Sequence, residues 1–354
     1  MLACRVASAA RRGCGARHND TVPPTSPLLA VTDLRVTLNT ARGPADALRG
    51  IDLQLARGAT LGLIGESGCG KSMTAMAIMG LLPAGAAVSG SIVLNGQELV
   101  GLADDAMCAL RGNRIGMVFQ EPMTALNPLH TVGDQIAEPL RLHRGMARAA
   151  ARAEALRLLE RVRLPQAAQR LDAYPHQLSG GQRQRVTIAM ALACGPDLLI
   201  ADEPTTALDV TIQAEILALI RELVIESGMA LLMISHDLGV MARTVTRLLV
   251  MYGGTVVESG PTGAVFAQLA HPYTRGLFAA RPRLGAPRVN GRKPRLMTIP
   301  GRVPELVDMP AGCPFADRCA WVAQACRAAP PAAVEVGPAH EARCIRLAAV
   351  GAVS

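Results

Sequence analysis

The chain is poor in aromatic residues and in lysine. Only 2% of its 354 residues are aromatic, which argues against a stacking platform for single-stranded nucleic acid. Of its 36 basic residues, only Lys71 and Lys293 are lysines. Charged residues make up 18% of the chain and apolar residues 50%. This balance excludes a disordered or collagen-like protein, and the length is sufficient for a large core.

Uninterrupted apolar segments of membrane-spanning length are also missing. Residues 72–97 carry no charge, but Gly80, Pro83 and Gly90 interrupt them. Because a spanning helix needs about 20 mainly apolar residues without such breaks, we predict a helix, a turn and a strand here. Residues 1–20 also lack the apolar segment of a secretory signal.

The net charge of +8 is concentrated at the two ends of the chain. Residues 1–27 carry four Arg and one Asp, and residues 281–354 carry eleven Arg or Lys and five Asp or Glu, which leaves residues 28–280 with a net charge of −1. A nucleic-acid-binding domain usually has a basic face on its folded core, so we expect no nucleic acid as a partner. We predict a disordered tail at 1–27 and a domain boundary near residue 281.

Short apolar runs alternate with helical segments between these ends. Runs at 59–64, 198–201 and 230–234 suit buried strands, and a helix is predicted at 212–226. This alternation is typical of an α/β protein with a largely parallel sheet. Other strands are predicted at 28–38, 51–55, 91–94, 115–119, 248–252 and 255–258, and another helix at 134–164.

A phosphate-binding loop is predicted after the run at 59–64. Residues 65–72 read G-E-S-G-C-G-K-S and match the pattern G-x-x-x-x-G-K-[ST]. Glycines allow backbone N–H groups to surround a phosphate, and the next helix points its positive end at the anion. We expect Lys71 to reach the β- and γ-phosphates and Ser72 to bind Mg²⁺. The expected ATP-binding residues are Gly65, Glu66, Ser67, Gly68, Cys69, Gly70, Lys71 and Ser72.

Two acidic residues end the apolar run at 198–201. Asp202 and Glu203 are expected at the carboxyl edge of the sheet, where ligands of α/β proteins bind. Asp202 can hold Mg²⁺ there, and Glu203 can polarise a water molecule in line with the γ-phosphate.

Residues 178–182 read L-S-G-G-Q and predict a helix start. Ser179 and Gln182 have the spacing of a capping box. Gly180 and Gly181 cost about 1 kcal/mol each in a helix, but they leave bare backbone donors that suit an anion.

These three motifs together resemble those of the ATP-binding-cassette (ABC) family. In the same order along the chain, Gln120 resembles the glutamine of the family's Q-loop, Asp209 the aspartate of its D-loop, and His236 its switch histidine. The resemblance implies a nucleotide-binding domain at 28–280, with a P-loop ATPase core, an antiparallel β subdomain and a helical signature subdomain at about 121–190. A small Cys-containing extension at 281–354 would follow.

The resemblance also implies a role for each site residue. Two cassettes pair, and each ATP lies between the phosphate loop of one and the signature segment of the other. Glu203 is then the general base, His236 holds the γ-phosphate, Gln120 senses Mg²⁺, and Asp209 communicates across the dimer. Leu38 stands where the family usually has an aromatic ring on adenine. The residues expected at the partner's ATP are Ser179, Gly180, Gly181 and Gln182.

Three further motifs narrow the resemblance to the ATPases of dipeptide, oligopeptide and nickel importers. The extended Q-loop at 120–128, His-Pro-Tyr at 271–273 and Ile-Pro-Gly at 299–301 are typical of that group. The expected function is ATP hydrolysis coupled to peptide uptake, at the cytoplasmic face of the membrane. The expected partners are a second cassette, two permease subunits and, indirectly, a solute-binding protein. The alternative is an ABC-type ATPase acting on ribosomes or DNA. The solute, and whether the two cassettes are identical, stay open.

Four of the nine cysteines cluster near the end of the chain. Their spacing is not that of a zinc ribbon, but four thiolates can hold zinc or an iron–sulfur cluster. Some members of the resembled group have a [4Fe–4S] cluster in this region. The alternatives are a cluster, zinc, or four thiols that are merely packed. The residues are Cys313, Cys319, Cys326 and Cys344.

Overall fold

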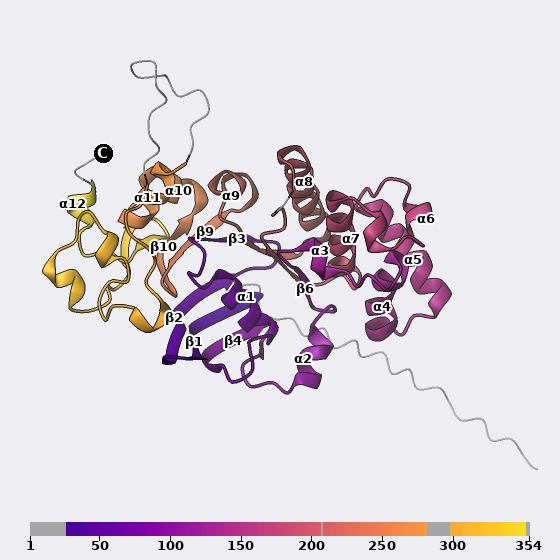
Figure 1. The fold of residues 1–354 in the computed structure, drawn as a ribbon, viewed down its shortest axis with the longest axis horizontal. Helices are drawn as coiled ribbons and strands as arrows, with labels where there is room; N and C mark the ends of the chain where they lie inside the picture. Colours follow the sequence, from indigo (N-terminus) through magenta and orange to yellow (C-terminus); the bar gives the residue numbers. More distant parts are fainter. Residues whose placement is uncertain (1–25, 207, 282–297, 352–354) are drawn as a thin grey trace, which may run out of the picture.

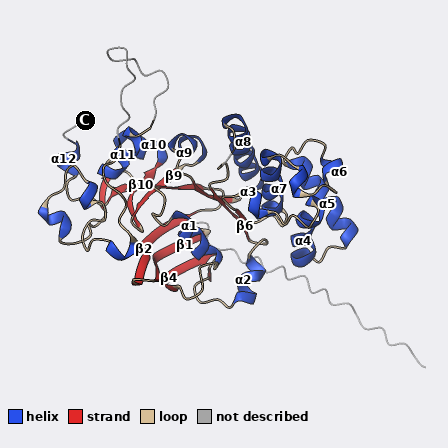
Figure 2. Ribbon diagram, in the orientation of Figure 1, coloured by secondary structure: helices blue, strands red, loops and turns tan. Residues whose placement is uncertain are grey.

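The computed structural model describes residues 26–206, 208–281 and 298–351, which form two sheets flanked by helices (Figures 1 and 2). The smaller sheet has four antiparallel strands in the order β2-β1-β4-β5. It confirms the expected antiparallel subdomain. The predicted tail at 1–27 falls outside the described residues except for its last two. The strands are β1 (Leu29–Thr40), β2 (Gly43–Leu55), β4 (Ala87–Leu94) and β5 (Gln97–Glu98).

The larger sheet has eight strands in the order β11-β12-β10-β9-β3-β8-β7-β6. Its five strands from β9 to β6 are parallel, and the other three are antiparallel. The strands are β3 (Thr60–Ile64), β6 (Ile115–Val118), β7 (Leu198–Asp202), β8 (Ala230–Ile234), β9 (Arg247–Tyr252), β10 (Thr255–Pro261), β11 (Val334–Gly337) and β12 (His340–Ala342).

The central strands of this sheet are buried on both faces. In β7, Leu198 and Ile200 pack into a core shared with the antiparallel sheet, whereas Leu199 and Ala201 pack into a core beneath the helices. Parallel strands covered on both sides have continuous apolar sequences rather than alternating ones. This is why the short apolar runs of the sequence correctly predicted β3, β7 and β8.

Helices cover the remaining faces. The prediction of a single helix at 134–164 is wrong. The stretch 134–164 is two helices, because Gly145 adopts a left-handed conformation (φ 62°) and ends the first of them. No helix in the described part of the chain is long and apolar enough to cross a membrane. The helices are α1 (Lys71–Met79), α2 (Asp104–Leu110), α3 (Pro122–Ala125), α4 (Val132–Arg144), α5 (Arg148–Arg161), α6 (Ala167–Arg170), α7 (Gly180–Leu192), α8 (Val210–Ser227), α9 (Leu238–Thr244), α10 (Thr262–Gln268), α11 (Pro272–Ala279) and α12 (Leu347–Gly351).

The C-terminal extension that follows residue 281 joins the large sheet directly. Strand β12 pairs with β10, next to a buried cluster around Glu258. The Glu258 carboxylate accepts hydrogen bonds from the backbone N–H groups of Ala270 (2.9 Å) and His271 (2.8 Å), and it lies 2.8 Å from Nε2 of His340. A buried carboxylate needs such partners, so this cluster fixes the strand hairpin β11–β12 to the start of α11.

His271 caps helix α11 from a fully buried position. Its Nδ1 accepts a hydrogen bond from the backbone N–H of Tyr273 at 3.1 Å. Burial lowers the pKa of His271 from its ordinary value of 6.5 to about 3, so the folded protein keeps this imidazole neutral at mildly acidic pH.

We expect this buried imidazole to make stability depend on pH. Between pH 6.5 and 3 the unfolded chain binds a proton at His271 that the folded chain does not. The contribution of the neutral imidazole to the free energy of unfolding is therefore full above pH 6.5 and is lost as the pH falls. From pH 7.5 to 5 the loss is about 2 kcal/mol. His271→Asn keeps a capping acceptor without this titration. The measurement is the free energy of unfolding of both proteins in urea at pH 7.5 and at pH 5. The amount by which the wild type exceeds the variant should be about 2 kcal/mol smaller at pH 5. An unchanged difference would contradict the assignment.

Candidate functional site

The phosphate loop connects β3 to α1 at the carboxyl edge of the parallel strands. Gly65, Gly68 and Gly70 all have positive φ (153°, 81° and 105°), and a Cβ on Gly65 would lie 2.2 Å from the carbonyl oxygen of Met251. Glycine is therefore required at position 65 by space as well as by conformation. The outer turn, Ser67 and Gly68, is exposed.

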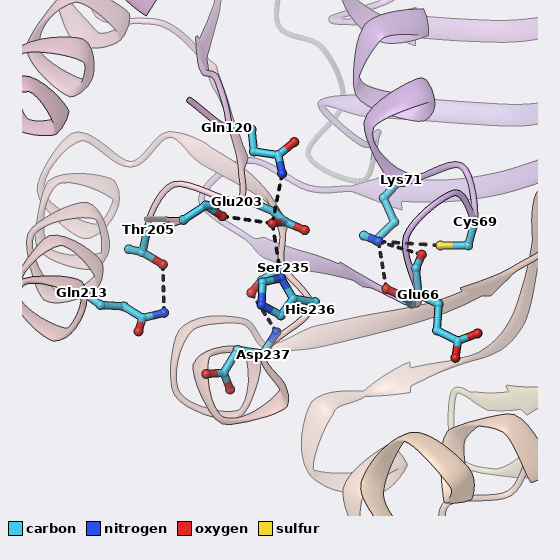
Figure 3. A network of polar contacts seen from close by, with 12 residues as sticks. Glu66, Cys69, Lys71, Gln120, Glu203, Thr205, Gln213, Ser235, His236 and Asp237 are labelled. Carbon is cyan, nitrogen blue, oxygen red and sulfur yellow. Dashed lines mark hydrogen bonds and ion pairs between the residues drawn. The ribbon is translucent and has the colours of Figure 1, made fainter. Parts of the chain in front are cut away.

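Lys71 lies folded over this loop. Its Nζ donates to the carbonyl oxygens of Gly65 (2.8 Å) and Glu66 (3.1 Å), and it lies 3.8 Å from Sγ of Cys69 (Figure 3). The Cys69 thiol is buried, and burial raises its pKa. This keeps it an inert, packed thiol rather than a thiolate. The only described lysine of the chain thus stands at the start of α1, where an ammonium can meet a phosphate.

Asp202 ends strand β7 beside this loop. Burial raises the pKa of its carboxyl, while a hydrogen bond with the Ser72 hydroxyl lowers it. Its Oδ1 is buried without a hydrogen-bond partner among the described residues. A buried oxygen with an unused lone pair next to a hydroxyl suits a hard cation. Ser72 and Asp202 therefore fit the Mg²⁺ site that the sequence predicts.

Glu203 is the centre of a polar network that joins three strand ends. Its Oε2 accepts from the hydroxyl of Thr206 (3.0 Å) and from Nε2 of Gln120 (3.4 Å), and it lies 3.2 Å from Nδ1 of His236 (Figure 3). Glu203 is itself in a left-handed conformation (φ 47°). Such a backbone is unfavourable for a non-glycine residue and is typical of functional sites.

These residues meet because parallel strands end at one edge. Gln120 follows β6, Glu203 follows β7 and His236 follows β8, and neighbouring parallel strands carry their carboxyl ends side by side. The His236 side chain is 69% exposed and the Glu203 side chain 15%. A carboxylate so placed can take a proton from water at the mouth of the site. Sequence reasoning missed Thr206, which had no motif signal beyond its position three residues after Glu203.

The signature segment starts helix α7, as predicted. The backbone N–H of Ser179 donates to Oε1 of Gln182 (3.0 Å), and the N–H of Gln182 donates to the Ser179 hydroxyl (3.4 Å). The structure adds a second reason for the glycine at 181. A Cβ there would lie 2.7 Å from Cγ2 of Ile212, so the glycine also permits close packing against α8. A Cβ on Gly180 would lie 3.3 Å from Leu208.

The structure does not bring this segment to the phosphate loop. Helix α7 packs on β6 and α8, whereas α1 packs against β2 and β7. The two helices lie apart in Figure 1. In the described part of the chain, no hydrogen bond joins the two motifs. Asp209 lies exposed at the start of α8, while Ala207, two positions before it, lies outside the described residues. Leu38 is half-buried on β1, packed against the antiparallel-sheet core.

Two residues beyond the predicted site also contact the phosphate loop. The backbone N–H of Glu66 donates to the hydroxyl of Tyr273 (2.7 Å), and Arg318 forms an ion pair with the Glu66 carboxylate. Both come from the C-terminal part of the chain. The sequence marks Tyr273 only as part of the His-Pro-Tyr motif and gives no sign of the Arg318 contact.

The four C-terminal cysteines converge on one small cavity, which His271 and Phe315 also line. Burial raises the pKa of three of the thiols, that of Cys313 to about 11. In the described residues, however, no three His, Cys, Asp or Glu side chains are placed to hold a metal ion. The donor set suits a soft metal, but the side chains do not form a finished metal site.

Comparison with known proteins places these features in a family. Residues 48–206 match the ABC transporter model, and residues 257–326 match the model of the oligopeptide/dipeptide transporter C-terminal region. The oligopeptide transport ATP-binding protein OppD of Salmonella typhimurium is 49% identical over 308 residues, covering 87% of this chain and 90% of that protein. A Brucella melitensis protein with a peptide import ATP-binding designation is 51% identical over 328 residues, covering 90% and 97%.

A solved structure has the same fold. An ATP-binding cassette in a dimeric, post-hydrolysis state with bound ADP and Pi matches with a TM-score of 0.60 and 30% identity. The match covers 66% of this chain and 98% of that one.

Proposed function

The chain belongs to the ATP-binding subunits of the ABC transporter family, and we propose that it hydrolyses ATP to drive the import of oligopeptides through separate membrane subunits. The observation that carries the proposal is the meeting of the phosphate loop, Asp202 and the Glu203 network at one edge of the sheet. The oligopeptide part rests on the match of residues 257–326 and on the named relatives.

ATP and Mg²⁺ binding are assigned to the loop and its neighbours. The backbone of residues 65–72 would surround the phosphates, with Lys71 moving from the loop carbonyls to the β- and γ-phosphates. Ser72 and Asp202 would hold Mg²⁺, with Gln120 near it. When bound, this ion neutralises charge that develops on the phosphates.

Hydrolysis is assigned to the Glu203 network. Glu203 would accept a proton from water as the water oxygen attacks the γ-phosphorus and the bond to the β–γ bridging oxygen breaks. The contacts from Gln120 and Thr206 fix the carboxylate. His236, an exposed member of the network, would hold the γ-phosphate.

A second cassette would complete the site. The signature segment and the phosphate loop are separate in this chain, and the similar solved cassette is dimeric. We therefore assign Ser179, Gly180, Gly181 and Gln182 to the ATP held by the partner, and Asp209 to contact across the dimer.

Membrane subunits would bind near the extended Q-loop. Residues 121–130 follow β6, and Leu129 in this segment is 81% exposed. This placement supports a peripheral position at the cytoplasmic face of the membrane, with a solute-binding protein acting on the far side. The net charge of −1 over residues 28–280 disfavours the alternative of action on ribosomes or DNA.

The base assignment predicts a separation of binding from turnover. Glu203→Gln keeps the size of the side chain but cannot accept the proton, so steady-state ATP hydrolysis should fall at least about 100-fold while ATP affinity is kept. Glu226→Gln is the matched control, because that carboxylate pairs with Arg161 on the surface. Normal turnover in Glu203→Gln would refute the assignment.

The transport assignment predicts which proteins accompany the chain. A tagged copy, purified from detergent-solubilised membranes of its own host, should bring down two multi-span proteins and either a second cassette or a second copy of itself. Recovery of ribosomal proteins or DNA without membrane proteins would instead support the alternative.

We also propose that the cysteine cavity takes up a [4Fe–4S] cluster, or failing that zinc, which would fix the C-terminal region. The support is the convergence of four thiols from four separate segments on one cavity. Anaerobically purified protein should contain iron and labile sulfide, or zinc. Replacing Cys313 and Cys326 by Ser should remove them, whereas Cys108→Ser, at an exposed site elsewhere, should not. Absence of all three elements from the wild type would reject the proposal.

A further inference from the structure

Glu66 places a carboxylate in a loop that is expected to bind a polyanion. It is the second residue of the phosphate loop, and its side chain is 28% exposed. A carboxylate near a triphosphate repels it, and the repulsion is stronger close to a protein surface than in bulk water. Binding of a polyanion by this loop therefore requires that the negative charge of Glu66 be neutralised or turned away.

Arg318 neutralises the charge of Glu66 through a bidentate ion pair. Its two terminal nitrogens lie 2.5 and 3.0 Å from the two carboxylate oxygens of Glu66. Its Nε donates to the carbonyl oxygen of Pro300 (2.8 Å), and one terminal nitrogen also donates to the Tyr252 hydroxyl (3.3 Å). The guanidinium lies over the Phe315 ring at 6.0 Å, and the side chain is only 6% exposed. Because these contacts hold the guanidinium in one place, Arg318 also fixes the position of the Glu66 carboxylate.

Tyr273 holds the backbone of the same residue. Its hydroxyl accepts the N–H of Glu66 at 2.7 Å, and its ring is fully buried against Tyr252. Lys71 donates to the Glu66 carbonyl oxygen at 3.1 Å. Glu66 is thus contacted at its N–H, its carbonyl and its carboxylate, and Figure 3 shows the carboxylate directed away from Lys71.

We propose that Arg318 and Tyr273 are positioning residues of the ATP site, and that Arg318 supplies the countercharge that lets a loop containing Glu66 accept a triphosphate. The inference rests on the proposed function of the loop. It makes helix α11, which carries Tyr273, and the C-terminal extension, which carries Arg318, part of the nucleotide-binding apparatus. Neither residue needs to touch the nucleotide for this role.

The test is rescue of ATP binding by removal of a charge. Arg318→Met leaves the Glu66 carboxylate unpaired, and the affinity for ATP in the presence of Mg²⁺, measured by titration calorimetry, should fall about tenfold. Adding Glu66→Gln to that variant removes the repulsion and should restore the affinity to within about threefold of the wild type. Damage to packing alone would not be repaired by the second substitution. Arg318→Lys keeps the charge and should lose less affinity than Arg318→Met.

Arg42→Met is the matched control. Arg42 also ties the C-terminal region to the body of the protein, through Glu305 and Asp308, but away from the loop. It should bind ATP as the wild type does. Tyr273→Phe should weaken binding a few-fold without any rescue by Glu66→Gln, because it removes a contact to the backbone.

The outcomes separate this inference from the proposed function. Failure of the wild type to bind ATP would overturn both. Normal binding by the wild type and by Arg318→Met, or a double variant as weak as Arg318→Met, would overturn the positioning role alone. If Arg318→Met does not fold, Arg318→Gln, which also removes the charge, decides: a loss of affinity that Glu66→Gln relieves supports the role, and unchanged affinity rejects it.

Discussion

The burial of three short strands on both faces is the constraint on which the site depends. Strands β3, β7 and β8 have five residues each, and nearly all of them are buried. A strand covered on both sides has no place for a polar side chain except at its ends. Because these strands are parallel, their carboxyl ends lie together. The phosphate loop, the acidic pair and His236 are therefore neighbours although up to 170 residues separate them.

Much of this arrangement could be predicted because its signals are local. An apolar run of four residues followed by two acids marks a buried strand and its exit, and a capping box marks the first turn of α7. The glycines of the phosphate loop have the positive φ values that the motif requires. Each signal lies within about ten residues, over which sequence pattern and backbone conformation are directly linked.

The features that sequence did not reveal depend on packing or on distant contacts. The break at Gly145 is the exception, because a glycine after a basic last turn is a local signal of a helix end that the prediction of one helix at 134–164 overlooked. The close approach of Ile212 to Gly181 requires knowing how α8 lies on α7. The ion pair of Glu66 with Arg318 joins residues 252 positions apart. No periodicity or spacing rule connects such residues, because only the fold brings them together.

The composition of the chain explains why the countercharge for Glu66 comes from so far away. Near the phosphate loop the sequence has a single cation, Lys71, which the phosphates themselves require, and residues 72–97 carry no charge at all. The guanidinium must then be delivered by another part of the fold. Strand β12, paired with β10, and the buried Glu258–His340 contact fix the C-terminal region where Arg318 can reach the loop. The pairing of Glu66 in the phosphate loop therefore depends on the last strands of the sheet, which hold Arg318 in place.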